Sequence, residues 1–314
     1  MTLLLNRADV QQLLTIDDCI DAVERAFRLL GEGRAGAPAI AGVHGEGGGY
    51  HIKAAILGDH FAAKINSNYF NAVPRIKGVI VVADAHDGSM LAIIDSIEIT
   101  ILRTGAASAV AAKYLARADA KSALIIGCGN QGRIQLRALE RVRNIERVFA
   151  IDVDRAKAAE LGEVVDAPVD ADVVITCTPS TSPILHRVRP GTFVAAVGAD
   201  SEIKSEIAPE LMRTSKIVTD LTLQCSTIGD LHHAPGATVH AELAEIVAGL
   251  KPGREHDGET IIFDSTGMAL QDVAAASIVY ERALAAGRGT RFDFGAFDTS
   301  HAQPAVRRRA GRGE

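Results

Sequence analysis

Residues 122–132, SALIIGCGNQG, decide the fold of this chain. An apolar run ends in a G-x-G-x-x-G motif, and a helical pattern follows it. The motif is weak evidence alone, but between a strand and a helix it is typical of a dinucleotide-binding βαβ unit. Gly127 permits the tight turn, Gly129 lets the backbone approach a pyrophosphate, and Gly132 lets the helix pack closely on the sheet. The predicted cofactor contacts of this turn are Gly127, Gly129, Asn130, Gln131 and Gly132, where free N–H groups open the helix.

An acidic residue ends the next predicted strand. Asp152 stands 25 residues after Gly127. Its carboxylate can accept hydrogen bonds from the adenosine ribose hydroxyls and would repel a 2′-phosphate, which favours NAD(H) over NADP(H). Arg155 lies close by and weakens that preference, and we include it among the predicted cofactor contacts. The competing interpretation is that the glycines only make a tight turn and that Asp152 only ends a strand.

From Asp119 onward, strand and helix patterns alternate. Predicted strands cover 123–126, 148–152, 173–177, 192–197, 216–219 and 261–264, and the clearest helices cover 131–142, 241–248 and 268–286. Such alternation predicts βαβ units, so the expected fold class is α/β with a Rossmann-type doubly wound parallel sheet. Ligands of these sheets lie at the carboxyl ends of the strands. The two loops that follow the strands 173–177 and 192–197 are therefore either ordinary turns or walls of the cofactor site. Their predicted cofactor contacts are Cys177, Thr178, Pro179, Val197, Gly198 and Ala199.

Before residue 118 the pattern is different. A capping sequence at Thr15 opens a predicted helix that ends at Gly31. Short strand-like runs then cover 51–57, 61–65, 78–84 and 90–95, with the hairpin signal Asp87-Gly88 between the last two. We expect an antiparallel sheet from about 36 to 96, then an Ala-rich helix over 99–116. In a chain of 314 residues, this change of pattern predicts two domains, the smaller one α+β.

Composition argues against several classes of function. The net charge is −6, and the one basic run is a tail that we interpret as a frayed terminus, with Arg307, Arg308, Arg309 and Arg312. Nucleic acid is therefore not an expected partner. No run of about 18 apolar residues predicts a membrane span. The N-terminus lacks the features of a signal peptide, so we expect a cytoplasmic protein. Four widely spaced cysteines indicate neither a disulfide framework nor a metal site.

Five polar side chains are candidates for chemistry. Lys53 and Lys64 interrupt apolar strand-like runs, and lysine is almost never buried without a partner, so each faces either solvent or a functional cavity. Arg103, near the start of the Ala-rich helix, has a planar fork suited to a carboxylate, although a surface position is the alternative. His51 shares a strand face with Lys53 and is a candidate acid or base. Asp230 lies in a loop, where it either neutralises a substrate ammonium or is solvated.

Longer segments carry a resemblance to a known family. They are AAK ending at Lys64, IKGVIVVADAHDGSMLAIIDS at 76–96, LRTGAASAVAAKYLARADAKSALIIGCGNQGRIQLRAL at 102–139, and FDSTGMALQDVA at 263–274. On these segments the chain resembles the ornithine cyclodeaminase/μ-crystallin family over nearly its whole length. Members of that family include ornithine cyclodeaminase, alanine dehydrogenase, ketimine and cyclic imine reductases, iminosuccinate reductase and hydroxyproline dehydratases.

The resemblance implies a domain plan. A substrate-binding and dimerisation domain would span 1–117, with 287–314 returning to it, and an NAD-binding Rossmann domain would span 118–286. The last helix of family members typically returns to the substrate domain. We therefore expect a homodimer whose ligands are NAD(H) and a small amino or imino acid.

The resemblance also implies site residues. Lys64 and Arg103 match the family's substrate-carboxylate and catalytic pair. Asp230 matches the acid that contacts the substrate amino group, with Asp220 as a nearby competitor. The same segments supply three further predicted cofactor contacts, which are Thr104, Ser265 and Gly267.

Two departures from the cyclodeaminase pattern bear on the reaction. Cyclodeaminases carry a Glu where His51 stands here, and an Arg in the preceding strand where this chain has Ala39 and Ile40. We therefore predict a reductive member of the family. Its substrate would be a small α-imino acid, either a cyclic imine or one formed from a 2-oxo acid and ammonia. NADH would supply the hydride, and the candidate proton donors are Lys64, His51 and Asp230.

Three points stay open at this stage. If the substrate is a dicarboxylate such as iminosuccinate, Lys53 would bind the second carboxylate. A second hypothesis is an ammonia-lyase or dehydratase that uses NAD internally, with His51 in the role of the family's Glu. A third is a non-catalytic, crystallin-like protein that binds NAD(P)H and a ligand, which the retained Lys64 and Arg103 argue against.

Overall fold

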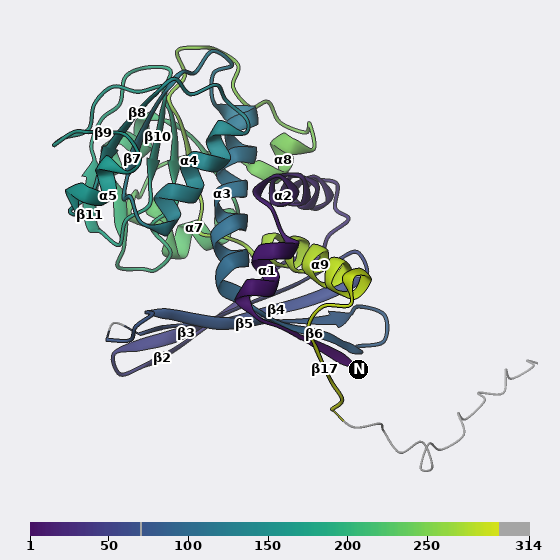
Figure 1. The fold of residues 1–314 in the computed structure, drawn as a ribbon. Coiled ribbons are helices and arrows are strands. Elements are labelled where there is room, and N and C mark those ends of the chain that lie inside the picture. The colour runs from purple at the N-terminus through teal and green to yellow at the C-terminus, as the bar shows by residue number, and fades with distance from the viewer. Residues whose placement is uncertain (70, 295–314) are drawn as a thin grey trace, which may run out of the picture.

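The computed structural model describes residues 1–69 and 71–294, which form two lobes connected through one long helix (Figure 1). One lobe contains an eight-stranded sheet and the other is closed by a seven-stranded sheet. Helix α3 (Ser96–Leu115) runs between them and packs against elements of both. The basic tail with Arg307, Arg308, Arg309 and Arg312, on which we expected a frayed terminus, lies outside the described residues.

The predicted antiparallel sheet is confirmed and is larger than expected. Its order is β17-β1-β6-β5-β4-β3-β2. The strands are β1 (Thr2–Leu5), β2 (Ala39–Gly45), β3 (Gly48–Leu57), β4 (His60–Tyr69), β5 (Ile76–Asp84), β6 (Met90–Asp95) and β17 (Thr290–Phe292). Strands β2 to β6 form an antiparallel meander, and β1 lies parallel to β6 and antiparallel to β17. Sequence patterns missed β1 and β17 because each is very short and depends on its partners for stability.

Helices cover the inner face of this sheet. They are α1 (Arg7–Leu13), the lower part of α3, and α9 (Ala269–Ala286), whereas α2 (Ile16–Gly31) packs on α3 and α9. Thr15 and Asp18 form the capping box that opens α2. Although α9 falls within the range 118–286, it packs against α2, β3 and β4. This packing supports including α9 in the lobe of the first sheet, and the domain division itself stays a proposal.

The second sheet is wholly parallel, which confirms the expected fold class. Its order is β15-β14-β16-β12-β10-β7-β8-β9. The strands are β7 (Ser122–Ile126), β8 (Arg147–Ile151), β9 (Glu163–Val164), β10 (Val173–Thr176), β12 (Phe193–Ala196), β14 (Lys216–Thr219), β15 (Val239–Glu242) and β16 (Ile261–Asp264). The chain leaves β7 toward β8 and later crosses to β10 on the other side. Such a reversal opens a ligand crevice at the carboxyl ends of β7 and β10.

Short elements complete the second lobe. They are α4 (Asn130–Glu140), α5 (Arg155–Ala159), α6 (Pro209–Thr214), α7 (Thr222–Ile228), the 3-10 helix η1 (Asp230–His233), α8 (Leu243–Val247), and the paired strands β11 (Thr181–Leu185) and β13 (Ser205–Ile207). The helix predicted over 241–248 begins only at Leu243, because β15 takes the two residues before it. Within residues 1–69 and 71–294, no helix is long and apolar enough to cross a membrane.

Candidate active site

The glycine turn has the geometry that its sequence predicts. Gly127 follows β7 with a φ of +98°, and a Cβ there would lie 2.7 Å from the Cys177 carbonyl oxygen. A Cβ on Gly132 would overlap the carbonyl oxygen of Gly127. Gly129 caps α4 without a side-chain bond to the helix, and a Cβ there would meet nothing within 4 Å. The first N–H groups of α4 therefore face a space that phosphate groups could occupy.

Asp152 lies directly after β8 and braces this turn. Its carboxylate accepts a hydrogen bond from Cys128 N at 2.6 Å and another from Asp154 N at 2.8 Å. Arg155 forms an exposed ion pair with Asp166. Asp152 is thus held beside the glycine turn, while the guanidinium of Arg155 is engaged elsewhere.

A buried glutamate joins the loops that follow β10 and β12. Glu206, on β13, accepts hydrogen bonds from Thr178 N at 2.6 Å, Thr178 Oγ1 at 2.7 Å and Gly198 N at 2.9 Å. Burial raises the pKa of its carboxyl to about 7. Cys177 Sγ donates to the carbonyl of Gly127 at 3.0 Å, which connects the first loop to the glycine turn. Pro179, Val197 and Ala199 lie in the same two loops. Glu206 was not predicted from the sequence, since a lone Glu in a polar stretch carries no signal.

The loop 265–267 after β16 lies between the two lobes. Asp220 accepts hydrogen bonds from Gly267 N at 2.6 Å and from Ser265 Oγ at 3.0 Å. Gly267 has a φ of +76°, and a Cβ there would overlap the guanidinium of Arg103. Asp220 therefore holds this loop, and Gly267 allows close contact with α3. The hydroxyl of Thr104, another predicted cofactor contact, donates to Thr100 O at 2.7 Å in its own helix.

Three cations of the first lobe gather behind this loop. Lys53 on β3 and Lys64 on β4 are directly paired in the sheet, and Arg103 approaches from α3. Their exposed fractions are only 7, 3 and 5 %. The alternatives in which these side chains face solvent are therefore wrong. Buried cations require partners, since an isolated charge in the interior is very costly.

The partner of two of these cations is Asp272 on α9. Lys64 Nζ lies 2.8 Å from Asp272 Oδ2, and Arg103 Nε lies 3.0 Å from Oδ1. Arg103 Nη1 also donates to Gln271 Oε1 at 2.9 Å. Neither Gln271 nor Asp272 was predicted from the sequence as a site residue. The available signal was two adjacent polar residues in the apolar helix ALQDVAAA.

Lys53 has a different partner. Its ammonium donates to the carbonyl oxygens of Thr266 at 2.9 Å and Gly267 at 2.6 Å. Burial lowers the pKa of Lys53, and the positive charge of Arg103 acts in the same direction. Burial likewise lowers the pKa of Lys64 to about 7, again with a contribution from Arg103. Lys64 can therefore exchange a proton near neutral pH.

The remaining candidates, His51 and Asp230, lie in different places relative to the cation cluster. His51 is half-buried on the same strand face as Lys53, and burial lowers its pKa. Asp230 is fully buried and accepts hydrogen bonds from Glu206 N at 2.7 Å and Ile207 N at 2.9 Å. Burial raises its pKa, and its second oxygen has no hydrogen-bond partner among the described residues. Among those residues, Asp230 makes no bond to the cation cluster.

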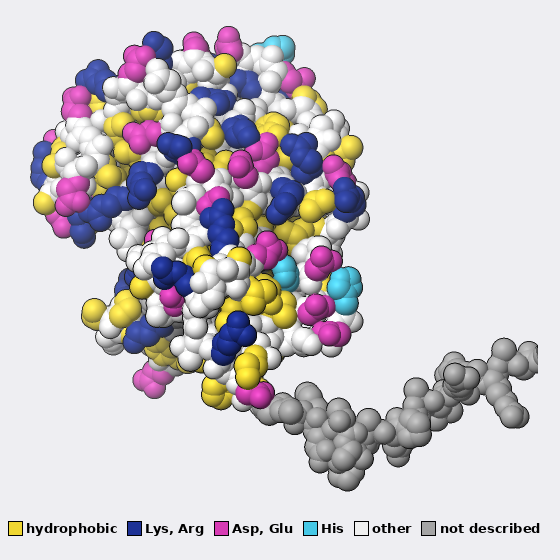
Figure 2. Space-filling model, turned by 45° about the vertical axis from the view of Figure 1, so that its right-hand side comes forward, with side chains coloured by type: hydrophobic (Ala, Val, Ile, Leu, Met, Phe, Trp, Pro, Cys, Tyr) yellow, Lys and Arg dark blue, Asp and Glu magenta, His cyan; other side chains and the backbone are white. Residues whose placement is uncertain are grey.

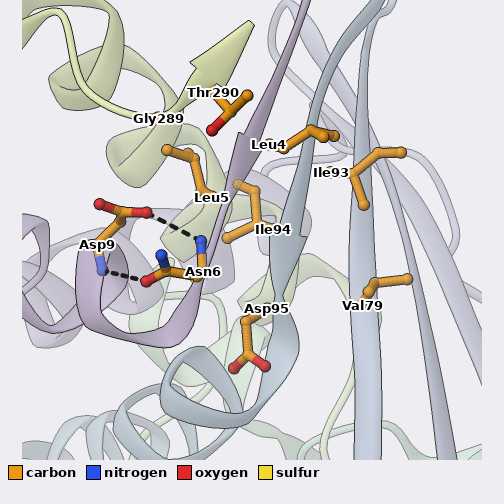
Figure 3. Close-up of a pocket in the computed structure, with 10 residues that line it drawn as sticks. All are labelled: Leu4, Leu5, Asn6, Asp9, Val79, Ile93, Ile94, Asp95, Gly289 and Thr290. Atoms are coloured by element: carbon orange, nitrogen blue, oxygen red, sulfur yellow. Dashed lines mark hydrogen bonds between the residues drawn. The ribbon is translucent and has the colours of Figure 1, made fainter. Parts of the chain in front are cut away.

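A separate hollow lies on the first sheet (Figure 3). It has a volume of about 550 Å³, and its wall includes no member of the cation cluster. The lining residues are Leu4, Leu5, Asn6, Asp9, Val79, Ile93, Ile94, Asp95, Gly289 and Thr290. On the face of the molecule in Figure 2, Lys and Arg are interspersed with Asp and Glu, without a continuous basic track. In the described ranges, no group of three or more His, Cys, Asp or Glu side chains is arranged to hold a metal ion.

Comparisons with known proteins agree with this arrangement. The model of the ornithine cyclodeaminase/mu-crystallin family matches residues 1–287. Alanine dehydrogenase of Archaeoglobus fulgidus is 38 % identical over 93 % of this chain and 98 % of its own length. Iminosuccinate reductase of Paracoccus denitrificans is 33 % identical over 88 % of this chain and 94 % of its own.

Two solved structures are also similar. An archaeal alanine dehydrogenase dimer with bound NAD has a TM-score of 0.90 at 36 % identity, covering 94 % of this chain and 99 % of that one. Delta(1)-pyrroline-2-carboxylate reductase of Thermococcus litoralis, in complex with NADH and L-proline, has a TM-score of 0.88 at 34 % identity. That match covers 93 % of this chain and 100 % of the other. The family resemblance found in the sequence is thereby confirmed.

Proposed function

The chain belongs to the ornithine cyclodeaminase/mu-crystallin family, and from that premise we propose that it is an NADH-dependent enzyme that reduces a small α-imino acid to an L-amino acid. The observation that carries the proposal is the contact between Arg103 and Gly267. Through this contact, the buried pair of Lys64 and Arg103 lies against the loop 265–267. That loop follows β16, at the edge of the sheet that bears the glycine turn. A carboxylate site thus adjoins a dinucleotide crevice.

Each cation has a proposed role. Arg103 uses Nε and Nη1 on Asp272 and Gln271, so we assign Nη2, which no described residue engages, to the substrate carboxylate. Lys64 supports the same carboxylate and donates a proton to the imine nitrogen. The nicotinamide, when bound, supplies the hydride. Burial of both side chains excludes water, which strengthens their interaction with an anion.

The cofactor that the crevice favours is NAD(H) rather than NADP(H). Asp152 presents a carboxylate beside the glycine turn, where a 2′-phosphate would be repelled. Arg155 pairs with Asp166 and does not compensate for that repulsion. The archaeal alanine dehydrogenase and the Thermococcus litoralis reductase were solved with NAD and NADH, respectively.

The proposed assembly is a homodimer through the outer face of the first sheet. Ile65 and Val79 are paired on adjacent strands and are each 38 % exposed, while their neighbours Lys64 and Ile80 point inward. Tyr50, 44 % exposed, extends this apolar face onto β3. Exposed apolar surface of this kind marks an interaction site. A second copy is the proposed occupant, since the archaeal alanine dehydrogenase is a dimer.

The proposed location is the cytoplasm. The four cysteines Cys19, Cys128, Cys177 and Cys225 are all free thiols. Proteins of reducing compartments rarely form disulfides, so this pattern fits the cytoplasm.

The environment of Lys53 bears on the substrate. Two of the three N–H donors of its ammonium are used on the carbonyls of Thr266 and Gly267. This favours a role in holding the loop over binding a second carboxylate. We therefore favour substrates with a single carboxylate, alanine-like or proline-like, over iminosuccinate.

The competing function is a lyase that uses NAD internally. His51 would act as its base, and the lowered pKa of His51 keeps the imidazole neutral and able to accept a proton. The deciding test is NADH consumption by the purified protein with pyruvate, oxaloacetate or glyoxylate plus ammonia, and with pyrroline- or piperideine-2-carboxylate. Consumption with any of these substrates supports the reductase. Silence with all of them, together with ammonia release from ornithine in the presence of NAD, supports the lyase.

A further inference from the structure

The buried carboxylate of Asp272 lies at the centre of the cation cluster. It is 1 % exposed, on the first turn of α9, and among the described residues Lys64 and Arg103 form ion pairs with it. Those groups come from β4 and α3, so Asp272 joins three elements that are distant in sequence. A carboxylate at this depth is costly unless it is paired and hydrogen-bonded. The two contacts with Lys64 and Arg103 meet that condition.

Charge balance in the cluster gives Asp272 a particular importance. The charged groups that act most strongly on Lys64 are Lys53 on β3, Arg103 on α3 and Asp272 on α9. Among the described residues, Asp272 is the anion in contact with Lys64 and Arg103, while Asp200 and Asp220 act on Lys53. Burial alone would raise the pKa of Asp272, but Lys64 and Arg103 outweigh it and hold that pKa below its usual value. Even with Asp272 present, the pKa of Lys64 is only about 7. Without the carboxylate, burial and two neighbouring cations would lower the pKa of Lys64 further.

We propose that Asp272 is a positioning residue, which holds Lys64 and Arg103 in place for the substrate carboxylate and keeps on Lys64 the proton that reduction consumes. The inference rests on the proposed function. Hydride adds to the imine carbon and forms a C–H bond, and the electrons of the C=N π bond move to nitrogen. Nitrogen takes a proton from Lys64 Nζ, which becomes a neutral amine and is reprotonated from solvent. NADH leaves as NAD⁺, so atoms and charges balance.

The test is the pH profile of kcat/KM for Asp272→Asn. In the reductive direction, kcat/KM of the unmodified enzyme falls as pH rises through the Lys64 pKa near 7. In the variant this falling limb moves to lower pH by about one unit or more, because one nearby opposite charge shifts a pKa by about that much. At pH 7.5 the loss falls mainly on kcat. KM changes little, since the asparagine amide oxygen can still accept the hydrogen bond from Arg103 Nε and so keeps the guanidinium in place.

Two matched variants separate charge from structure. Gln271→Leu removes a neutral hydrogen bond to the same guanidinium, so it lowers kcat/KM without moving the limb. Asp272→Glu retains the charge and restores the limb toward its original position. A limb for Asp272→Asn that coincides with that of the unmodified enzyme would overturn the inference. If Asp272→Asn does not fold, Asp272→Glu and Gln271→Leu are compared instead. A falling limb for Asp272→Glu that moves no more than that of Gln271→Leu supports the inference. Equal loss of activity in these two variants, with both limbs displaced by the same amount, contradicts the inference.

A measurement without turnover keeps the inference separate from the proposed function. If the unmodified protein turns over no imine, the proposed function fails, and the charge on Lys64 is read from stability instead. The folded-state pKa of Lys64, about 7, lies below the ordinary lysine pKa of 10.5, so the folded protein binds fewer protons than the unfolded chain between these two values. The free energy of unfolding therefore rises with pH across this range. In Asp272→Asn the rise starts at lower pH, and a rise that starts at the same pH contradicts the inference.

Discussion

The dinucleotide crevice and the cation cluster are built in different ways. The crevice is formed by backbone groups of consecutive residues, where Gly127, Gly129 and Gly132 leave space that side chains would fill. The cation cluster is formed by charged side chains from three separate elements, β3, β4 and α3. Each of these side chains is at most 7 % exposed. A local motif therefore encodes the first, whereas tertiary packing assembles the second. The two regions should respond differently to substitution.

The largest effect is expected from removing the proposed proton donor of the cluster. Lys64→Met should lower kcat/KM for imine reduction by roughly a thousandfold, the scale of general acid catalysis, while the Kd for NADH stays nearly unchanged. Lys121→Met, at an exposed lysine of the second lobe that pairs with Glu146, is the matched control and should retain full activity. Steady-state kinetics and NADH titration measure both variants. A Lys64→Met enzyme with normal turnover would remove the cluster from the mechanism.

Two glycine substitutions separate stability from binding in the crevice. In Gly132→Ala the new Cβ would overlap a backbone carbonyl, so we expect a loss of about 2–4 kcal/mol in the free energy of unfolding, together with weak NADH binding. In Gly129→Ala the Cβ meets no protein atom within 4 Å, so stability is retained. NADH binding should still weaken roughly ten- to hundredfold, since the phosphates lose close approach to the backbone. Thermal unfolding and NADH titration give both quantities. Tight NADH binding by Gly129→Ala would show that the phosphates lie elsewhere.

Substitution of Lys53 should have a smaller effect and sharpens the choice of substrate. Lys53→Met loses the two bonds to the carbonyls of Thr266 and Gly267, so kcat/KM should fall roughly three- to tenfold. The loss should be the same for oxaloacetate plus ammonia as for pyruvate plus ammonia. A selective rise of KM for the dicarboxylate would instead assign Lys53 to substrate binding.

The smallest expected effect is on the pH dependence of stability through Glu206. Its folded-state pKa of about 7 is above the ordinary glutamate pKa of 4.5, so the folded protein binds more protons than the unfolded chain between these two values. The free energy of unfolding should fall as pH rises through this window. Glu206→Gln should remove that slope and leave the NADH Kd within about threefold. The free energy of unfolding of both proteins, measured from pH 4.5 to 7.5, checks this prediction. An unchanged slope in Glu206→Gln would contradict the raised pKa of Glu206.

The sequence likewise predicts locally encoded features better than features that tertiary packing assembles. The parallel sheet was predicted because its strands are continuous apolar runs followed by helical patterns, and Val173–Thr176 is buried at every position. Alternation could not decide between inward and outward positions for Lys53 and Lys64, since a period of two fits either face of the sheet. Register fixes the face, and register depends on neighbouring strands.

The partners of charged groups were harder to predict than the groups themselves. Asp272 lies 208 residues from Lys64, and no spacing rule connects positions so far apart. Glu206 likewise acts by binding the backbone N–H groups of two loops, which a sequence pattern does not reveal. The family resemblance supplied Lys64 and Arg103 as a pair, and the packing of α9 supplied their common carboxylate.

The most direct test of the central claim follows the hydride itself. The protein is incubated with NADH carrying deuterium in both C4 positions, together with pyrroline-2-carboxylate or with pyruvate and ammonia, and the amino acid is analysed by mass spectrometry. We expect one deuterium at Cα for each NADH consumed. If NADH is not consumed and no product carries deuterium, reduction is contradicted. Release of ammonia from ornithine in a parallel incubation with NAD would then establish lyase chemistry at this site.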